Sequence, residues 1–271
     1  MNGSASLVPK RKDIDMAEKT GIAWTDSTFN PWIGCTKVGP GCDHCYAEAL
    51  MDKRWHKVQW GSGQQRARTS AENWKQPLLW QREHEAFTLS HGRRRRVFCA
   101  SLADVFDNEA PPQWRGELWA LVKDTLHLDW LILTKRIGNV NGMAPAEGLP
   151  SNVWLGATVV NQEEYDRDAH KLLAVPASVR FLSVEPMLGP IDLGYLREWT
   201  VSNRRLIDWV IVGGESGYSA RPILRGWIES VRRQCDAAGV PFFFKQWGGP
   251  SATAGGCALN GAELKAWPVA A

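Results

Sequence analysis

Six short apolar runs recur along this chain, and their spacing constrains the fold more than any other feature. Their first residues lie about 23 to 33 residues apart, which leaves room for one helix between consecutive strands. The runs are Val97–Leu102, Trp130–Thr134, Val153–Thr158, Val179–Val184, Trp209–Val212 and Val240–Phe244. An earlier strand is expected around Phe29–Gly34. The alternation predicts an α/β fold, a partial or closed (β/α) barrel of parallel strands with outer helices.

Segments between these runs carry apolar residues at helical spacing. Residues 113–128 place Trp114 and Leu118 on one helical face, and residues 223–238 repeat the pattern until it stops at Gly239. The first strand is not followed by a Gly-x-Gly-x-x-Gly turn. Its absence argues against a dinucleotide-binding sheet and favours the barrel.

Composition divides the chain into three parts. Residues 1–16 are polar and are predicted to be a disordered extension. Residues 17–249 are predicted to form the barrel domain, with an insertion near 57–90 where the alternation breaks, and residues 250–271 a loose tail. No apolar run reaches the roughly 18 residues of a membrane span. The lack of a leader and of a disulfide pattern predicts a cytoplasmic protein with no membrane partner.

Three cysteines fall within eleven residues, on a loop rich in glycine and proline. The turn Gly39-Pro40-Gly41 can bring Cys35 back to Cys42 and Cys45, so that the three thiolates converge on one metal centre. Three protein ligands leave one coordination position open, which is typical of catalytic metal sites. A disulfide framework is disfavoured because the chain is long and lacks a secretory leader.

The same cysteines fit either an iron–sulfur cluster or a zinc ion. Zinc sites normally combine two close pairs of ligands, and no second pair of cysteines or histidines follows here. The pattern therefore favours an iron–sulfur cluster. The alternative is a structural zinc site with His44, His56 or Cys99 as the fourth ligand.

Polar residues follow each apolar run, at positions that share the C-terminal rim of a parallel barrel. They are Asp104, Lys135, Arg136, Asn161, Gln162, Glu185, Gly213, Gly214, Glu215, Ser216, Lys245 and Gln246. The cysteine loop follows the first strand and is expected on the same rim. The pattern predicts an active site, because barrel enzymes keep their catalytic groups there. The alternative is that Lys135 and Arg136 form structural ion pairs with Glu185 or Asp104.

Basic runs raise nucleic acid as an alternative partner. The net charge of +3 is too small to indicate a polyanion ligand, but the chain contains Lys10–Lys12, Arg93–Arg96, Arg204–Arg205 and Arg232–Arg233. Such runs are usually solvated faces. Most of the fifteen tryptophans are expected in the core, and a few could stack on bases.

Several segments together resemble a phage-associated bacterial family of three-cysteine proteins that is grouped with radical SAM-like barrels. They are Trp24–Asp26, Asn30–Trp32, Gly34–Glu48, Ser101–Phe106, Leu133–Arg136, Glu185–Pro190, Val212–Ser216 and Phe244–Trp247. The resemblance covers about residues 17–249. It implies a barrel of the radical SAM type and an enzyme that cleaves S-adenosylmethionine reductively to start radical chemistry on an unknown substrate.

The resemblance also implies roles for the rim. Cys35, Cys42 and Cys45 would hold a [4Fe–4S] cluster whose fourth iron binds S-adenosylmethionine, supplied with an electron by a donor protein. Candidates for cofactor binding are Ser101 and Asp104 by their position after the second strand, or Glu215 by residue type, together with Gly213, Gly214 and Ser216 beside it. Glu185, Lys135, Arg136 and Lys245 would act in catalysis, the last three by holding carboxylate or phosphate groups.

The chain departs from the usual radical SAM pattern in two places. Six residues, rather than three, separate Cys35 from Cys42, and His44 stands where an aromatic residue usually precedes the last cysteine. The glycine-glycine-glutamate segment comes late, ending at Glu215, while Ser101–Asp104 follow the second strand. Alternatives are therefore an enzyme of the same chemistry acting on nucleic acid, for repair or base modification, and a non-catalytic zinc-stapled binding module.

Overall fold

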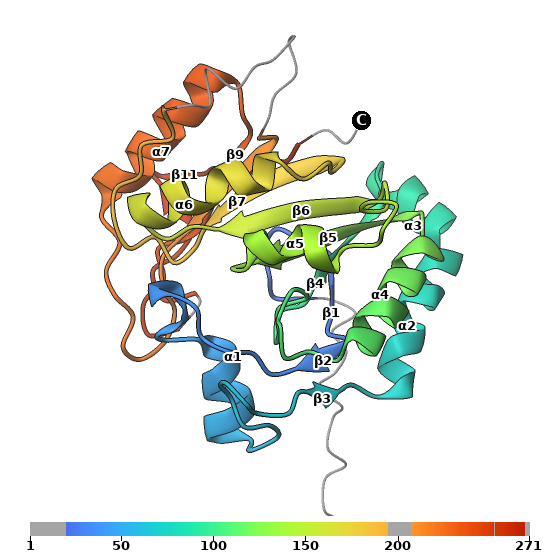
Figure 1. Ribbon diagram of the computed structural model, residues 1–271. Coiled ribbons are helices and arrows are strands. Elements are labelled where there is room, and N and C mark those ends of the chain that lie inside the picture. Colours follow the sequence, from blue (N-terminus) through green and yellow to red (C-terminus); the bar gives the residue numbers. More distant parts are fainter. Residues whose placement is uncertain (1–19, 195–206, 252, 269–271) are drawn as a thin grey trace, which may run out of the picture.

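The computed structural model describes residues 20–194, 207–251 and 253–268, and a curled parallel sheet forms its centre (Figure 1). The seven strands are β1 (Ser27–Phe29), β4 (Arg95–Cys99), β5 (Leu128–Thr134), β6 (Val153–Thr158), β7 (Val179–Val184), β8 (Trp209–Gly213) and β9 (Phe242–Gln246). They pair in chain order, with β1 and β9 at the two edges. The sheet is therefore a half-barrel, which confirms the partial form of the predicted α/β barrel.

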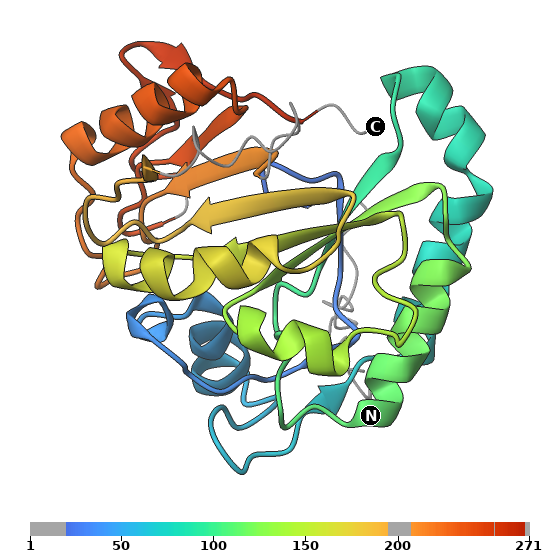
Figure 2. The same ribbon diagram turned by 45° about the horizontal axis from the view of Figure 1, so that its top comes forward.

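Helices surround the convex side of the half-barrel (Figures 1 and 2). They are α2 (Ala71–Arg82), α3 (His84–His91), α4 (Pro112–Lys123), α5 (Val140–Met143), α6 (Gln162–Leu173) and α7 (Arg225–Ala238). The short helix α1 (Tyr46–Glu48) lies instead in the cysteine loop. The predicted helices at 113–128 and 223–238 correspond to α4 and α7. Gly239 ends α7 in the left-handed region, with φ of 65°, because glycine adopts this conformation without strain.

Two apolar clusters hold the sheet. The outer one lies between the strands and α4, α6 and α7. The inner one fills the concave side and consists of Trp24, Phe98, Leu131, Trp154, Val179, Phe181, Trp209, Ile211 and Phe243. Phe181 lies over Gly156 on the neighbouring strand, where a Cβ atom would come within 2.3 Å of the ring. Tryptophans contribute to both clusters, as expected for packing between a sheet and its helices.

The first strand differs from its prediction at 29–34. β1 ends at Phe29, and residues Trp32–Ile33 form β2, which pairs antiparallel with β3 (Ala67–Arg68) outside the main sheet. The chain turns away at Asn30 because its side chain accepts a hydrogen bond from the Leu102 amide at 2.8 Å. Pro31 has no amide proton to continue the ladder. The region near 57–90, predicted as an insertion, contains β3, α2 and most of α3.

The last part of the chain also differs from the expected loose tail. The strands β10 (Ala258–Leu259) and β11 (Ala262–Glu263) form a hairpin. The chain then runs antiparallel to β9, where the Phe244 amide donates to Leu264 O at 2.8 Å and the Ala266 amide to Phe242 O at 3.1 Å. The Trp267 ring packs edge-on against Phe243, with centroids 5.0 Å apart. The predicted disordered extension, residues 1–16, lies outside the described residues.

The basic run Arg93–Arg96 has internal partners at the opposite end of the sheet from the cysteine loop. Arg93 pairs with Asp26 at 2.6 Å, and the Arg96 guanidinium stacks over Trp154 and Trp267. Arg95 lies 4.3 Å from the centroid of the Phe87 ring. These contacts stabilise the N-terminal ends of the strands.

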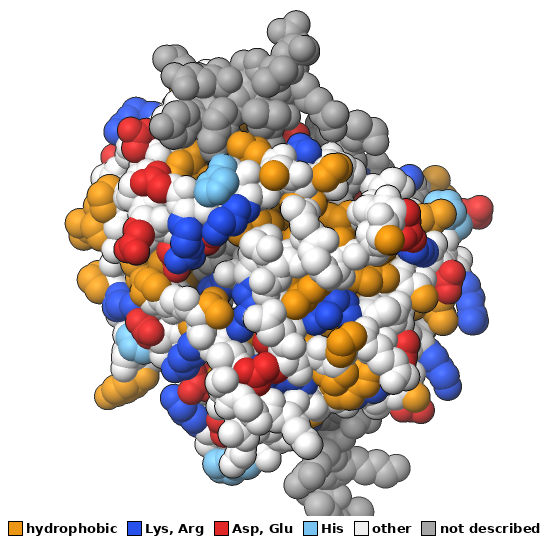
Figure 3. All heavy atoms as spheres, in the orientation of Figure 1, with side chains coloured by type: hydrophobic (Ala, Val, Ile, Leu, Met, Phe, Trp, Pro, Cys, Tyr) orange, Lys and Arg blue, Asp and Glu red, His pale blue; other side chains and the backbone are white. Residues whose placement is uncertain are grey.

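The other basic runs either have a local acidic partner or lie outside the described residues. Arg232 on α7 lies 3.5 Å from Asp236, while Lys10–Lys12 and Arg204–Arg205 lie outside the described residues. On the face shown in Figure 3, basic and acidic side chains are interspersed. In the described parts of the chain, no helix is long and apolar enough to cross a membrane.

Candidate active site

A cavity of about 690 Å³ opens at the C-terminal ends of the strands. Predicted site residues that line it are Cys35, Cys42, Cys45, Ser101, Asp104, Lys135, Arg136, Glu185, Gly214, Glu215, Ser216 and Lys245. One part of its wall is apolar and includes Trp24, Phe98 and Leu133. The structure therefore brings the cysteine loop and the strand-end residues together around one cavity of the size that small ligands occupy.

The three cysteines reach this cavity from different parts of one loop. Cys35 follows β2, Cys42 ends a short 3₁₀ turn over Pro40–Cys42, and Cys45 directly precedes α1. The Cys42 amide donates to Gly39 O at 2.9 Å, which closes the predicted turn. Within the described residues, no three side chains of histidine, cysteine, aspartate or glutamate are grouped as a metal site.

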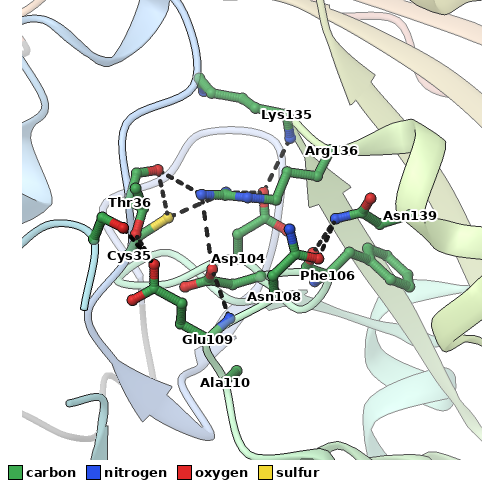
Figure 4. Close-up of polar contacts among 12 residues, drawn as sticks. Cys35, Thr36, Asp104, Phe106, Asn108, Glu109, Ala110, Lys135, Arg136 and Asn139 are labelled. Atoms are coloured by element: carbon green, nitrogen blue, oxygen red, sulfur yellow. Dashed lines mark hydrogen bonds and ion pairs between the residues drawn. The ribbon is translucent and has the colours of Figure 1, made fainter. Parts of the chain in front are cut away.

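Cys35 is held by Arg136 (Figure 4). The guanidinium donates to Cys35 Sγ at 3.3 Å, to Asp104 Oδ2 at 3.1 Å and to Thr36 O at 2.5 Å. Burial and the nearby Asp104 carboxylate raise the pKa of the Cys35 thiol to about 12, despite the opposing charge of Arg136. Arg136 therefore forms the structural ion pair with Asp104 that the sequence left as an alternative.

Asp104 joins the ends of β4 and β5. Besides Arg136, its carboxylate accepts hydrogen bonds from Thr134 Oγ1 at 2.8 Å and from the Lys135 amide at 3.1 Å. The Phe106 amide donates to the same carboxylate at 3.0 Å. Buried carboxylates require such donors to offset lost hydration, so Asp104 positions Arg136 and the start of the β5–α5 loop.

Glu185 and Lys245 form an ion pair across β8. Glu185 follows β7 and Lys245 lies in β9, and their charged groups are in direct contact in the cavity. Gly213 at the end of β8 lies beneath Glu185, and a Cβ atom there would come within 3.2 Å of the carboxylate carbon. A glycine at this position lets the Glu185 side chain lie flat over β8 and reach Lys245.

Glu215 links the loop after β8 to the cysteine loop. Its carboxylate accepts from Arg221 Nη2 at 2.6 Å and lies 2.9 Å from His44 Nδ1. Arg221 also donates to Pro40 O at 2.8 Å and pairs with Asp43 at 3.1 Å. Burial alone would raise the pKa of Glu215, but the hydrogen bonds from Arg221 and His44 lower it to about 2.

Replacing Glu215 by glutamine is expected to remove stability that depends on pH. Because the pKa of the folded state lies below the ordinary value of 4.5, the carboxylate stabilises the fold above that value. This contribution is lost as the pH falls from about 4.5 towards 2. Urea unfolding measures the free energy of unfolding of both proteins. The difference between the parent and Glu215→Gln should decrease by roughly 2 kcal/mol from pH 7 to pH 3.

The matched control for this change is Glu229→Gln on α7. Glu229 pairs with Arg225 at the surface, where solvent screens the contact that lowers its pKa, so its loss should change the pH profile of unfolding much less. A gap between parent and Glu215→Gln that is the same at both pH values would contradict the role given to the Glu215–Arg221 contact.

The remaining predicted residues contact their own chain. Ser101 Oγ exchanges hydrogen bonds with the Asn30 side chain, and the Ser101 carbonyl accepts from Tyr46 Oη at 2.6 Å. Ser216 Oγ accepts from Gln246 Nε2 at 2.7 Å. Of the proposed fourth zinc ligands, His44 lines the cavity, while His56 and Cys99 are not among the lining residues.

Two arginines that position the cysteine loop were not identified from the sequence. Arg66 is buried and donates to Thr36 Oγ1 and Asp107 Oδ2, both at 2.7 Å. Arg221 holds the other side of the loop at Pro40. Neither stands in a motif, and an arginine in a polar loop is usually a solvated residue. The only available signal was the acidic pair Asp107 and Glu109 soon after Asp104.

Comparison with known proteins places the chain in one family. No match was found among curated proteins or solved structures. The family described as protein of unknown function, DUF5131, matches residues 19–268, nearly the whole chain. The half-barrel and its cavity lie within this matched region. This chain therefore belongs to the DUF5131 family.

Proposed function

We propose that this protein is a radical-SAM-like iron–sulfur enzyme in which Cys35, Cys42 and Cys45 hold a [4Fe–4S] cluster. One observation carries the proposal: all three cysteines line a single cavity at the C-terminal ends of a parallel half-barrel. This is the end at which barrel enzymes place their catalytic groups. Three protein thiolates leave one iron free to bind a cofactor.

The residues present fit such a cluster in type and location. Three thiolates bring negative charge into a partly apolar cavity, and cationic groups lie beside two of them. Arg136 donates to Cys35 Sγ at 3.3 Å. Burial raises the pKa of the Cys45 thiol, and the charge of Lys135 only partly opposes this shift. In the described residues no three such ligands are grouped as a metal site, so cluster binding requires the cysteine side chains to move closer together.

A cluster of this kind, with S-adenosylmethionine and one electron from an external donor, supplies reductive cleavage of the sulfonium carbon–sulfur bond to methionine and a 5′-deoxyadenosyl radical. The apolar wall formed by Trp24, Phe98 and Leu133 keeps water from part of the cavity. The Glu185–Lys245 pair offers one carboxylate and one ammonium group to the polar parts of a bound cofactor or substrate.

Anaerobic reconstitution with iron and sulfide tests the proposal. The parent protein is expected to take up about four irons per chain, the content of one [4Fe–4S] cluster, and to form 5′-deoxyadenosine from S-adenosylmethionine under a chemical reductant. Cys42→Ala is expected to lose both the iron and the product, because two thiolates do not hold the cluster. Iron analysis, the visible absorption spectrum and product chromatography give the readouts.

Cys257→Ala is the matched control for the cysteine variant. Cys257 lies in the C-terminal segment, outside the cavity, and contacts Glu263. Its replacement should leave iron content and product unchanged. Stoichiometric zinc, no iron, and no cleavage of S-adenosylmethionine in the parent would overturn the proposal in favour of the zinc-stapled binding module.

A further inference from the structure

Lys135 differs from the other basic residues of the cavity. Of the described lysines and arginines that line it, Lys37 pairs with Glu48, Arg136 with Asp104 and Lys245 with Glu185. No described carboxylate lies within ion-pair distance of Lys135. Its ammonium contacts the Thr158 hydroxyl at 3.4 Å. A cation without an internal counter-charge in a cavity is suited to an anionic group of a ligand.

Two hydroxyl-bearing residues lie on the strands next to Lys135. Lys135 follows β5, Thr158 ends β6, and Ser183 lies on β7, where it is paired in register with Thr158. Both hydroxyl residues are nearly buried and line the cavity. The three side chains therefore come from neighbouring strands and offer one ammonium and two O–H donors.

The Lys135 stem lies close to the cysteine loop. A Cβ atom on Gly41 of the cysteine loop would lie 3.4 Å from Lys135 Cε, so the lysine stem passes beneath this glycine. Figure 4 shows the Lys135 side chain on a different path from that of Arg136, while the Lys135 amide donates to Asp104. A side chain confined by a neighbouring loop loses less conformational entropy when it binds a ligand.

We propose that Lys135, Thr158 and Ser183 form an oxyanion subsite for a carboxylate or phosphate group of the substrate. This proposal adds a binding subsite to the function proposed above. It rests on that function only because it calls the bound molecule a substrate. An ammonium with two hydroxyl donors matches the acceptor-rich face of a carboxylate or phosphate group. The oxyanion would hold the substrate against the strand ends, beside the three cysteines.

The first test titrates the full chain, as purified without reconstitution, with inorganic phosphate. Calorimetry is expected to show phosphate binding that Lys135→Met weakens by about 10-fold or more, since a charge-assisted hydrogen bond is lost. Thr158→Val, which keeps the side-chain shape, should weaken it several-fold. Lys37→Met removes the same charge from the cavity mouth and should leave the affinity unchanged.

Equal weakening by Lys135→Met and Lys37→Met would indicate a general charge effect and overturn the subsite, as would no effect of Thr158→Val. Thermal unfolding of each variant shows whether it is folded. Because this titration needs no cluster, failure to take up iron would refute the proposed function and leave the oxyanion result standing.

A second test distinguishes the substrate from the cofactor as the source of the oxyanion. Reconstituted protein is titrated with S-adenosylmethionine and with its decarboxylated form. Equal affinities of the parent and Lys135→Met for S-adenosylmethionine support a substrate oxyanion. A loss in Lys135→Met that matches the loss on removing the carboxylate assigns the subsite to the cofactor and overturns the substrate proposal.

Discussion

Arg66→Met is expected to lower the free energy of unfolding by about 3–5 kcal/mol, because it removes the nearest cation from the buried Asp107 carboxylate and leaves Arg136 at 3.8 Å. The Arg66 side chain is fully buried and pairs with Asp107 at 2.7 Å. It also donates to the carbonyls of Gly61 and Gln64 and to the Thr36 hydroxyl. Methionine fills a similar volume but satisfies none of these acceptors. Urea unfolding at pH 7 measures the loss.

Arg68→Met is the matched control, two residues further along. Arg68 is 33% exposed, pairs with Glu117 at the surface and stacks over Trp74, so its loss should cost less than about 1 kcal/mol. The double variant Arg66→Met/Asp107→Asn should recover part of the loss, since the unpaired buried charge is gone. If Arg66→Met and Arg68→Met lowered the free energy of unfolding by similar amounts, the buried hydrogen-bond network around Arg66 would not contribute to stability.

Gly156→Ala is expected to cost about 3 kcal/mol, because it overfills the inner core. The new methyl group would come within 2.3 Å of the Phe181 ring. That ring has no exposed surface and packs against Trp24 and Trp209, with centroids 6.2 and 5.6 Å away. It therefore has no free space into which to move. Thermal and urea unfolding of the variant should show the loss directly.

Gly116→Ala is the matched control, and here the same substitution is expected to raise stability. Gly116 lies within α4, and a Cβ atom there meets nothing within 4 Å. Alanine should raise stability by about 0.5–1 kcal/mol, since glycine is a poor helix former. A Gly156→Ala variant as stable as the parent would mean that the inner core is loosely packed.

The main strands could be predicted from the sequence because each is a short apolar run with its own boundary signals. β6 and β7 have the predicted bounds, and β8 extends one residue further. The first strand was placed too late. Its end depends on the Asn30 side chain and the Leu102 amide, which are far apart in the sequence. A contact of that kind leaves no local pattern.

The candidate site could be located from the sequence but not resolved in detail. Strand ends and the cysteine loop predicted many of the residues that line the cavity, although Asn161, Gln162 and Gly213 are not among them. The sequence did not predict which of these side chains form ion pairs or hydrogen bonds within the protein. Arg136 and Lys135 are adjacent in the sequence, but their surroundings differ. Arg136 is bound to Asp104 and Cys35, whereas the Lys135 ammonium reaches only a hydroxyl among described residues. Long-range packing decides such differences.

The segment that follows the β11 hairpin has a consequence for self-association. An edge strand exposes a row of unpaired amide and carbonyl groups, which other chains can use to extend the sheet. Here the backbone of Leu264 and Ala266 occupies those groups on β9, and Trp267 shields the adjoining aromatic face. The folding unit thus extends past residue 249. Residues 264–267 cover the β9 edge, so another chain cannot add a strand there.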